Sequence, residues 1–202
     1  VYSEYGLTGK DIHVAVLDTG IDTDHIDLSD SVESQVCFAD FCPNGADNAE
    51  DDNGHGTHVS GIIGSKGISS SVGVARNTRI HAIKVLDSSN GFSSSSIIIE
   101  ALDHIINNLP QVNLVNMSLG TFDRFESFCD QQNIYTRAFA TAIKTLRDRG
   151  TLSFVASMNN ASSNSISAPA CISNAISVGA VWDSNPSVSY THLRAHETVV
   201  HL

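Results

Sequence analysis

Residues 12–20 read Ile-His-Val-Ala-Val-Leu-Asp-Thr-Gly. The apolar, β-branched part of this stretch predicts a buried strand, and its last three residues predict the turn that ends the strand. Segments with strand patterns and segments with helix patterns alternate along the chain. This alternation predicts an α/β fold, a doubly wound, mostly parallel sheet with helices on both faces. Further strands are expected at residues 79–86, 112–117, 152–157 and 172–181, and helices at residues 57–64, 95–108 and 133–149.

Length and composition narrow the class of protein. The 202 residues, of which 41% are hydrophobic and 16% charged, are enough for one globular domain with a core. Acidic residues outnumber basic ones by 22 to 11, and the net charge of −11 argues against a nucleic-acid or anionic-lipid partner. No apolar run reaches the ~18 residues that span a bilayer. The first residues, VYSEYGLTGK, lack the features of a signal peptide, so we expect the chain to start within a processed or cut protein.

The 4 cysteines allow three disulfide pairings. The most economical pairing joins Cys37 to Cys42 within one loop and Cys129 to Cys171 across a longer segment. Two such bonds suit an oxidising, extracellular compartment. The alternative is four free thiols in a cytosolic protein. No Cys-x-x-Cys pattern indicates a zinc site.

Three polar residues follow expected strands at their carboxyl ends, where parallel sheets build their sites: Asp18, Ser118 and Asn159. Because Asp18 directly follows an apolar strand, we expect its carboxylate to be partly buried and to need a donor. His55, which lies between glycines in Asn-Gly-His-Gly, is the obvious partner. A carboxylate that holds an imidazole in one tautomer is two-thirds of a nucleophilic triad. The simpler alternatives are a turn-capping Asp18 and a His55 that binds a loop carbonyl.

The segments around these two residues carry a family resemblance. Residues 14–22, Val-Ala-Val-Leu-Asp-Thr-Gly-Ile-Asp, and residues 53–61, Asn-Gly-His-Gly-Thr-His-Val-Ser-Gly, closely resemble the Asp and His signatures of the subtilisin-like serine proteases. The resemblance continues in the family's order through residues 84–86, 115–120 and 177–180. It implies the subtilisin-like fold and a secreted serine endopeptidase that hydrolyses peptide bonds in protein or peptide substrates. It also implies a propeptide in the intact precursor, and we expect a monomer.

The resemblance assigns roles to individual residues. Asp18 corresponds to the triad acid and His55 to the general base. Ser118, Leu119 and Gly120 correspond to the extended segment that pairs with substrate backbone, although an ordinary strand exit is the simpler alternative.

Asn159 matches the residue whose side chain binds the oxyanion in this family. The sequence departs from the family pattern immediately before it, because Met158 stands where glycine is usual. A side chain at that position restricts the backbone. Asn160 is the alternative residue for the same role.

Three features of the sequence bear on metal binding. No cofactor is required for the chemistry, but Asp27 matches a residue that often ligates calcium in this family, while the loop at residues 65–71 lacks the asparagine ligands expected there. The acidic run at residues 47–52 could hold a weakly bound ion, but it is interpreted as a solvated charge run. His58 matches a structural histidine. A metal-dependent hydrolase that uses Asp18, His55 and His58 is the rival interpretation.

The last part of the chain departs from the family. The nucleophilic serine belongs to a Gly-Thr-Ser-Met type of motif, and no segment of the chain matches it. We therefore expect the chain to be inactive by itself, and a non-catalytic, peptide-binding pseudoprotease is a further alternative. Residues 188–202 instead fit, in one reading frame, the translation of a transposase-type sequencing adapter. The hypothesis is a partial peptidase domain at residues 1–187 followed by a non-native tail, against a divergent natural tail, and the nucleotide sequence distinguishes the two.

Overall fold

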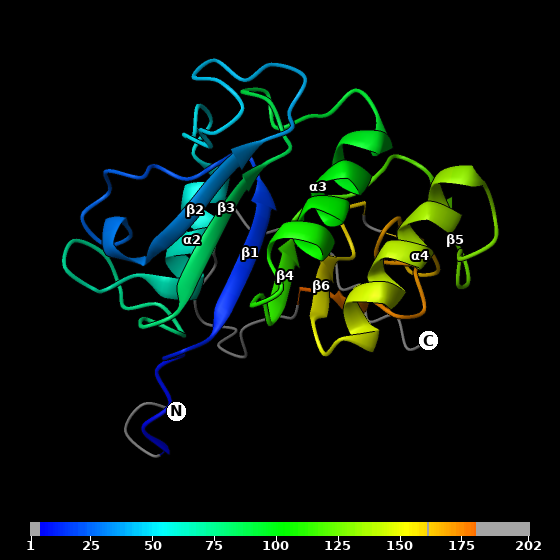
Figure 1. The fold of residues 1–202 in the computed structure, drawn as a ribbon. Helices are drawn as coiled ribbons and strands as arrows, with labels where there is room; N and C mark the ends of the chain where they lie inside the picture. The colour runs from blue at the N-terminus through cyan, green and yellow to red at the C-terminus, as the bar shows by residue number, and fades with distance from the viewer. Residues whose placement is uncertain (1–4, 161, 181–202) are drawn as a thin grey trace, which may run out of the picture.

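The computed structural model describes residues 5–160 and 162–180. Its centre is a six-stranded parallel sheet in the order β2-β3-β1-β4-β6-β8 (Figure 1). The strands are β1 (His13–Asp18), β2 (Val32–Cys37), β3 (Arg79–Lys84), β4 (Leu114–Met117), β6 (Leu152–Ala156) and β8 (Ile176–Val178). A short antiparallel pair, β5 (Arg124–Phe125) and β7 (Ile166–Ser167), and a 3₁₀ helix (Ser29–Ser31) lie outside this sheet. The expected tail at residues 188–202 lies outside the described residues.

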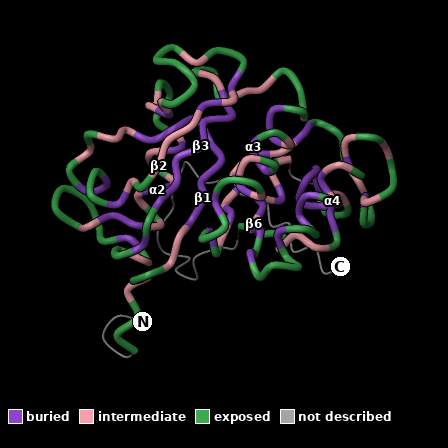
Figure 2. Tube along the Cα trace, in the orientation of Figure 1, coloured by how far each residue is buried: buried purple, intermediate pink, exposed green. Residues whose placement is uncertain are grey.

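Helices cover both faces of the sheet, as the doubly wound prediction requires. Helix α2 (His55–Gly64) packs on one face, whereas α3 (Ser95–Asn108) and α4 (Ile134–Asp148) lie side by side on the other (Figure 1). Successive side chains of β1 alternate between the two faces, because a strand has a period of two residues. Val14 and Val16 therefore join the core under α2, and Ala15 and Leu17 join the larger core under α3 and α4. The central strands are almost entirely buried (Figure 2).

The three helices begin in different ways. Ser94 caps α3 by accepting a hydrogen bond from the Ser96 N–H, and Asn133 and Thr136 form a reciprocal capping box at the start of α4. Helix α2 begins after Gly54, whose φ is +104° and which has no side chain to cap the helix. The N–H groups in the first turn of α2, which have no partner within the helix, must therefore find acceptors elsewhere.

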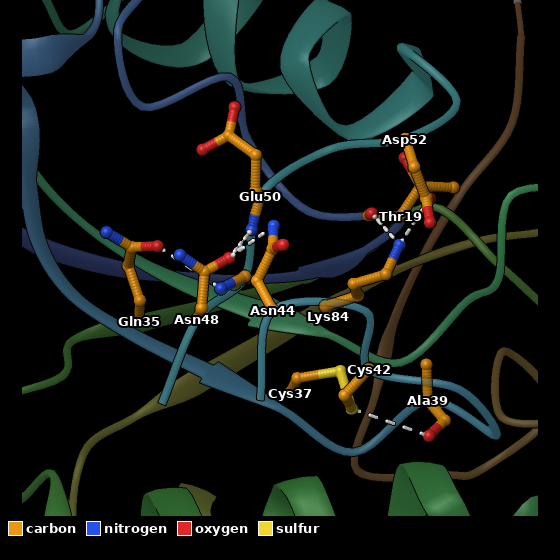
Figure 3. The surroundings of a disulfide bond; sticks show 11 residues. Thr19, Gln35, Cys37, Ala39, Cys42, Asn44, Asn48, Glu50, Asp52 and Lys84 are labelled. Carbon is orange, nitrogen blue, oxygen red and sulfur yellow. Dashed lines mark hydrogen bonds and ion pairs between the residues drawn. A yellow bond between two sulfur atoms is a disulfide. The ribbon is translucent and has the colours of Figure 1, made fainter. Parts of the chain in front are cut away.

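Both expected disulfides are confirmed. Cys37 pairs with Cys42, five residues apart, at the end of β2, and Cys129 pairs with Cys171, 42 residues apart. In the chain-entropy description, the longer loop gives a stabilisation of about 4 kcal/mol and the shorter one about 2 kcal/mol. The short disulfide lies beside Lys84 at the carboxyl end of β3 (Figure 3). It therefore stabilises the start of the loop that leads to α2.

Candidate active site

Asp18 and His55 are in direct contact. The Nδ1 of His55 lies 2.7 Å from the Oδ1 of Asp18. Because an ionised carboxylate can only accept hydrogen bonds, this contact places the imidazole proton on Nδ1 and leaves Nε2 as the acceptor. The Asp18 side chain has no exposed surface, whereas 35% of the His55 side chain is exposed. The pair thus joins a buried carboxylate to an imidazole that reaches solvent.

Glycine at position 56 allows the two elements to approach. Asp18 is the last residue of β1, and His55 is the first residue of α2. A Cβ on Gly56 would lie 2.1 Å from the Gly20 carbonyl oxygen and 3.1 Å from the Asp18 carboxylate. No side chain fits there without moving the backbone. The glycine that follows His55 in the sequence is therefore required by packing.

Burial dominates the electrostatics of Asp18. It raises the pKa of the Asp18 carboxyl, while the hydrogen bonds from His55 and the Thr19 N–H act in the opposite direction. Both donors bind the same oxygen, Oδ1, at 2.7 Å. The other oxygen, Oδ2, is buried and has no hydrogen-bond partner in the part of the chain that the structure describes. A buried carboxylate with one unpaired oxygen favours a neighbouring hydrogen-bond donor, and here that donor is the His55 imidazole.

Residues 118–120 leave β4 at the same edge of the sheet as Asp18 leaves β1, since the two strands are parallel neighbours. Over residues 5–160 and 162–180, none of the backbone N–H or C=O groups of Ser118, Leu119 and Gly120 makes a backbone hydrogen bond. Leu119 is buried, and its side chain anchors the segment in the core. The segment therefore offers free main-chain groups to an added strand.

The turn after β6 holds the two asparagines. Asn159 is exposed, and its side chain has no hydrogen bond to any described residue. The Asn160 amide instead donates to the Ser167 Oγ at 3.2 Å. Of the two side chains, that of Asn159 is thus the one without a hydrogen-bond partner among the described residues.

Met158 has the backbone conformation that its place in the family pattern predicts. Its φ is +74°, a region that side chains with a Cβ rarely adopt and glycine adopts readily. Its side chain lies on Gly120, where an added Cβ would be 2.7 Å from the Met158 Cγ and 2.9 Å from its sulfur. The turn after β6 and the segment after β4 are therefore packed directly against each other.

The side chains around Asp27 do not fit a calcium ion. Asp27 has no exposed surface, and both of its oxygens accept hydrogen bonds from the N–H groups of residues 68–70 and from the hydroxyls of Ser69 and Ser70. Calcium requires ligand oxygens that face the ion, whereas this loop presents donors. Burial alone would raise the pKa of Asp27, but these bonds hold it well below its usual range.

The rival metal site has no geometric support either. Among the described residues, no three His, Cys, Asp or Glu side chains come together as a group that could hold a metal ion. His58 is exposed on the first turns of α2, and its side chain is separate from the Asp18–His55 contact.

Two carboxylates in the loop before α2 have structural roles that were not predicted from the sequence. Asp51 and Asp52 belong to the run interpreted as solvated, but the structure corrects this, since both accept hydrogen bonds from partly or fully buried groups. Lys84, with 1% of its side chain exposed, donates to Asp52 at 2.6 Å and to the Thr19 carbonyl at 2.5 Å (Figure 3). The available signal was a carboxylate, Asp51, four residues before the first residue of an uncapped helix.

Comparison with known proteins agrees with this geometry. The model of the subtilase family matches residues 9–199. The chain is 37% identical over 196 residues to Subtilisin Savinase of Lederbergia lenta, covering 96% of this chain and 65% of that protein. It is 33% identical over 187 residues to the Minor extracellular protease Epr of Bacillus subtilis (strain 168), covering 92% of this chain and 26% of that protein.

The fold is also similar to that of a solved structure. Sphericase superposes with a TM-score of 0.73 at 30% identity, covering 91% of this chain and 60% of that one. The chain thus spans between about a quarter and two-thirds of the length of these relatives. In the described ranges, no helix combines the length and apolar character needed to cross a membrane. The parallel sheet, the Asp18–His55 contact and the sequence matches lead to one conclusion, that this chain belongs to the subtilase family.

Proposed function

We propose that the protein is a serine endopeptidase of the subtilisin type, in which Asp18 and His55 act with a serine supplied from outside the described residues. The observation that carries the proposal is the 2.7 Å contact between a fully buried carboxylate and a partly exposed imidazole. The family membership supports the same reaction. No segment of the 202 residues resembles the nucleophile motif, so we propose that this chain is inactive by itself.

His55 would act as the proton carrier. As the serine Oγ bonds to the scissile carbonyl carbon, its proton passes to the His55 Nε2. The imidazolium then gives that proton to the leaving amine nitrogen as the C–N bond breaks. Water repeats the sequence to release the acyl group. Asp18 would keep the ring in the tautomer that accepts at Nε2 and would stabilise the imidazolium.

Two further segments would bind the substrate. Residues 118–120 would pair with substrate backbone through their unpaired main-chain groups. Asn159 would donate to the oxyanion, because its amide is exposed and Asn160 is already bound to Ser167.

We also propose that the protein is secreted, is made with a propeptide and works as a monomer on protein or peptide substrates. Two disulfides support an oxidising compartment. One relative is named as an extracellular protease.

The test uses the complete protein that the source gene encodes, with peptide cleavage and fluorophosphonate labelling as readouts. We expect His55→Ala to lower kcat about 10²–10⁴-fold, since general base catalysis is lost. The matched control is His58→Ala, one turn further along α2, which should retain activity. Loss of activity in both variants, together with inhibition by chelators and no labelling, would favour the metal-dependent hydrolase instead. A folded complete protein that neither cleaves peptides nor reacts with the fluorophosphonate would favour a peptide-binding pseudoprotease.

A further inference from the structure

The start of α2 is capped by side chains from outside the helix. Its first three N–H groups, those of His55, Gly56 and Thr57, donate to Asn53 Oδ1 at 3.2 Å, Thr19 Oγ1 at 2.9 Å and Asp51 Oδ2 at 3.0 Å. Gly54 contributes no side chain. The orientation of the first helical turn, and thus of His55, depends on these three acceptors.

The carboxylate of Asp51 accepts five hydrogen bonds around this helix start. Its Oδ2 accepts from Thr57 twice, from the N–H at 3.0 Å and from the hydroxyl at 2.5 Å. Its Oδ1 accepts from the Thr19 hydroxyl at 2.8 Å and from the N–H groups of Gly54 and Asn53 at 2.9 and 3.0 Å. Burial works against the charge, but these bonds lower the pKa of Asp51. The carboxylate therefore carries its charge at the amino end of the helix, where the helix dipole favours it.

Thr19 connects this cap to the candidate active site. Its hydroxyl donates to Asp51 and accepts from the Gly56 N–H. Its own N–H donates to the Asp18 Oδ1 at 2.7 Å, the oxygen that also accepts from His55. A continuous set of hydrogen bonds thus runs from Asp51 through Thr19 to the carboxylate that holds the imidazole.

Asp52 provides a natural contrast within the same loop. Its carboxylate accepts from Lys84, which also binds the Thr19 carbonyl (Figure 3), and within the described residues it accepts no hydrogen bond from the start of α2. The two neighbouring aspartates are the same residue type but bind different groups. One caps the helix, and the other pairs with a buried lysine.

We propose that Asp51 is the positioning residue of the candidate catalytic histidine, holding His55 against Asp18 by capping α2 and binding Thr19. The proposal rests on the proposed function only in giving His55 its catalytic role. Asp51 itself touches neither the imidazole nor the Asp18 carboxylate. It acts on geometry, through two elements that converge at the site, and its negative charge adds to burial in raising the pKa of the Asp18 carboxyl.

The experiment follows the His55 Nδ1 proton by NMR in the 202-residue chain without substrate. A proton held between an imidazole and a carboxylate gives a far-downfield, slowly exchanging signal. In Asp51→Asn an NH₂ group replaces one acceptor and opposes the surrounding N–H and O–H donors. We expect the signal to disappear or its exchange to accelerate at least about tenfold, the factor that corresponds to 1.4 kcal/mol of a lost net hydrogen bond. Asp52→Asn, which removes the same charge one residue away, should retain the signal.

A second pair of variants covers the case in which Asp51→Asn does not fold. Thr19→Val removes the hydroxyl link and should lose the signal, whereas Thr19→Ser keeps the hydroxyl and should retain it. Unchanged exchange in folded Asp51→Asn, or no downfield signal in the unsubstituted chain, would overturn the proposal. Because the readout needs no turnover, a protein that proves not to be a peptidase still gives a result. In a complete, active protein, Asp51→Asn should lower kcat more than it changes KM.

Discussion

Asp18 and Asp27 are both fully buried, but their carboxylates differ in the number of hydrogen bonds that they accept and in the direction of their pKa shifts. Asp18 receives two hydrogen bonds on one oxygen, and its second oxygen has no partner within the described residues. Asp27 receives five bonds, which occupy both oxygens. The pKa of Asp18 is raised and that of Asp27 is lowered. The number of donors, and not burial alone, separates a carboxylate that responds to protons from one that fixes a loop.

The largest effect on stability is expected from Asp27→Asn. An amide offers one acceptor oxygen where the loop at residues 68–70 presents five donors, so several buried donors lose their partner. The thermal midpoint should fall by on the order of 10 °C, measured by scanning calorimetry. Asp24→Asn is the control, since Asp24 is exposed. If the thermal midpoint fell no further in Asp27→Asn than in the control, the hydrogen bonds of Asp27 would not be what fixes the loop at residues 68–70.

The second-largest expected effect is on the pH dependence of stability. It comes from His81, a different buried group, and lowers the stability in acid. Burial lowers the pKa of His81 to about 4, with additional effects of His13, Glu33 and His104. Between about pH 6.5 and pH 4 the unfolded chain therefore binds a proton that the folded chain does not, so stability falls as the pH falls through this range. The full contribution is about 3 kcal/mol.

Urea unfolding at a series of pH values measures this contribution of His81. His81→Gln should flatten the pH dependence, and the same substitution at exposed His58 is the control. In His81→Gln, the remaining loss of stability in acid reflects the carboxyl groups more directly, so the contributions of Asp18 and Asp27 are easier to compare. A pH dependence that stays unchanged in His81→Gln would show that another group dominates.

A smaller effect on stability is expected from Asp18→Asn, although the chemical change is the same as at Asp27. The amide oxygen can keep the bonds to Thr19 and His55, and the NH₂ group replaces an oxygen that already lacks a partner. The free energy of unfolding should stay within about 1 kcal/mol of the original value by urea titration. A loss as large as that of Asp27→Asn would show that the two carboxylates have the same structural role.

The smallest effect is expected from calcium. Because the Asp27 site presents donors and not ligand oxygens, millimolar calcium or a chelator should shift the thermal midpoint by less than about 1 °C. Magnesium serves as the control for ionic strength. A midpoint that rises steadily with the logarithm of calcium concentration would demonstrate a site and a rearranged loop.

Strong periodicity made most of the fold predictable. Helix α3 begins and ends where its apolar spacing predicted, and the apolar strand before Asp18 is β1. Strand β2 was not predicted, because Val-Glu-Ser-Gln-Val-Cys is a half-buried edge strand without a clear alternation. The Asp18–His55 contact was predictable from a buried carboxylate that needs a donor and from the family resemblance. Asp51 was not, since a carboxylate four residues before the first residue of a helix looks in sequence like part of any acidic loop.

Contact between Met158 and Gly120 has a consequence for evolution and for engineering. The side chain of Met158 occupies the volume that any larger residue at position 120 would need. Changes at the two positions should therefore be strongly non-additive, so that a larger residue at 120 is tolerated only when 158 becomes small. Glycine at 158 would also suit the positive φ there. A library that varies position 120 alone therefore samples mainly disfavoured sequences, and one that varies both positions gives access to differently shaped surfaces where the two segments meet.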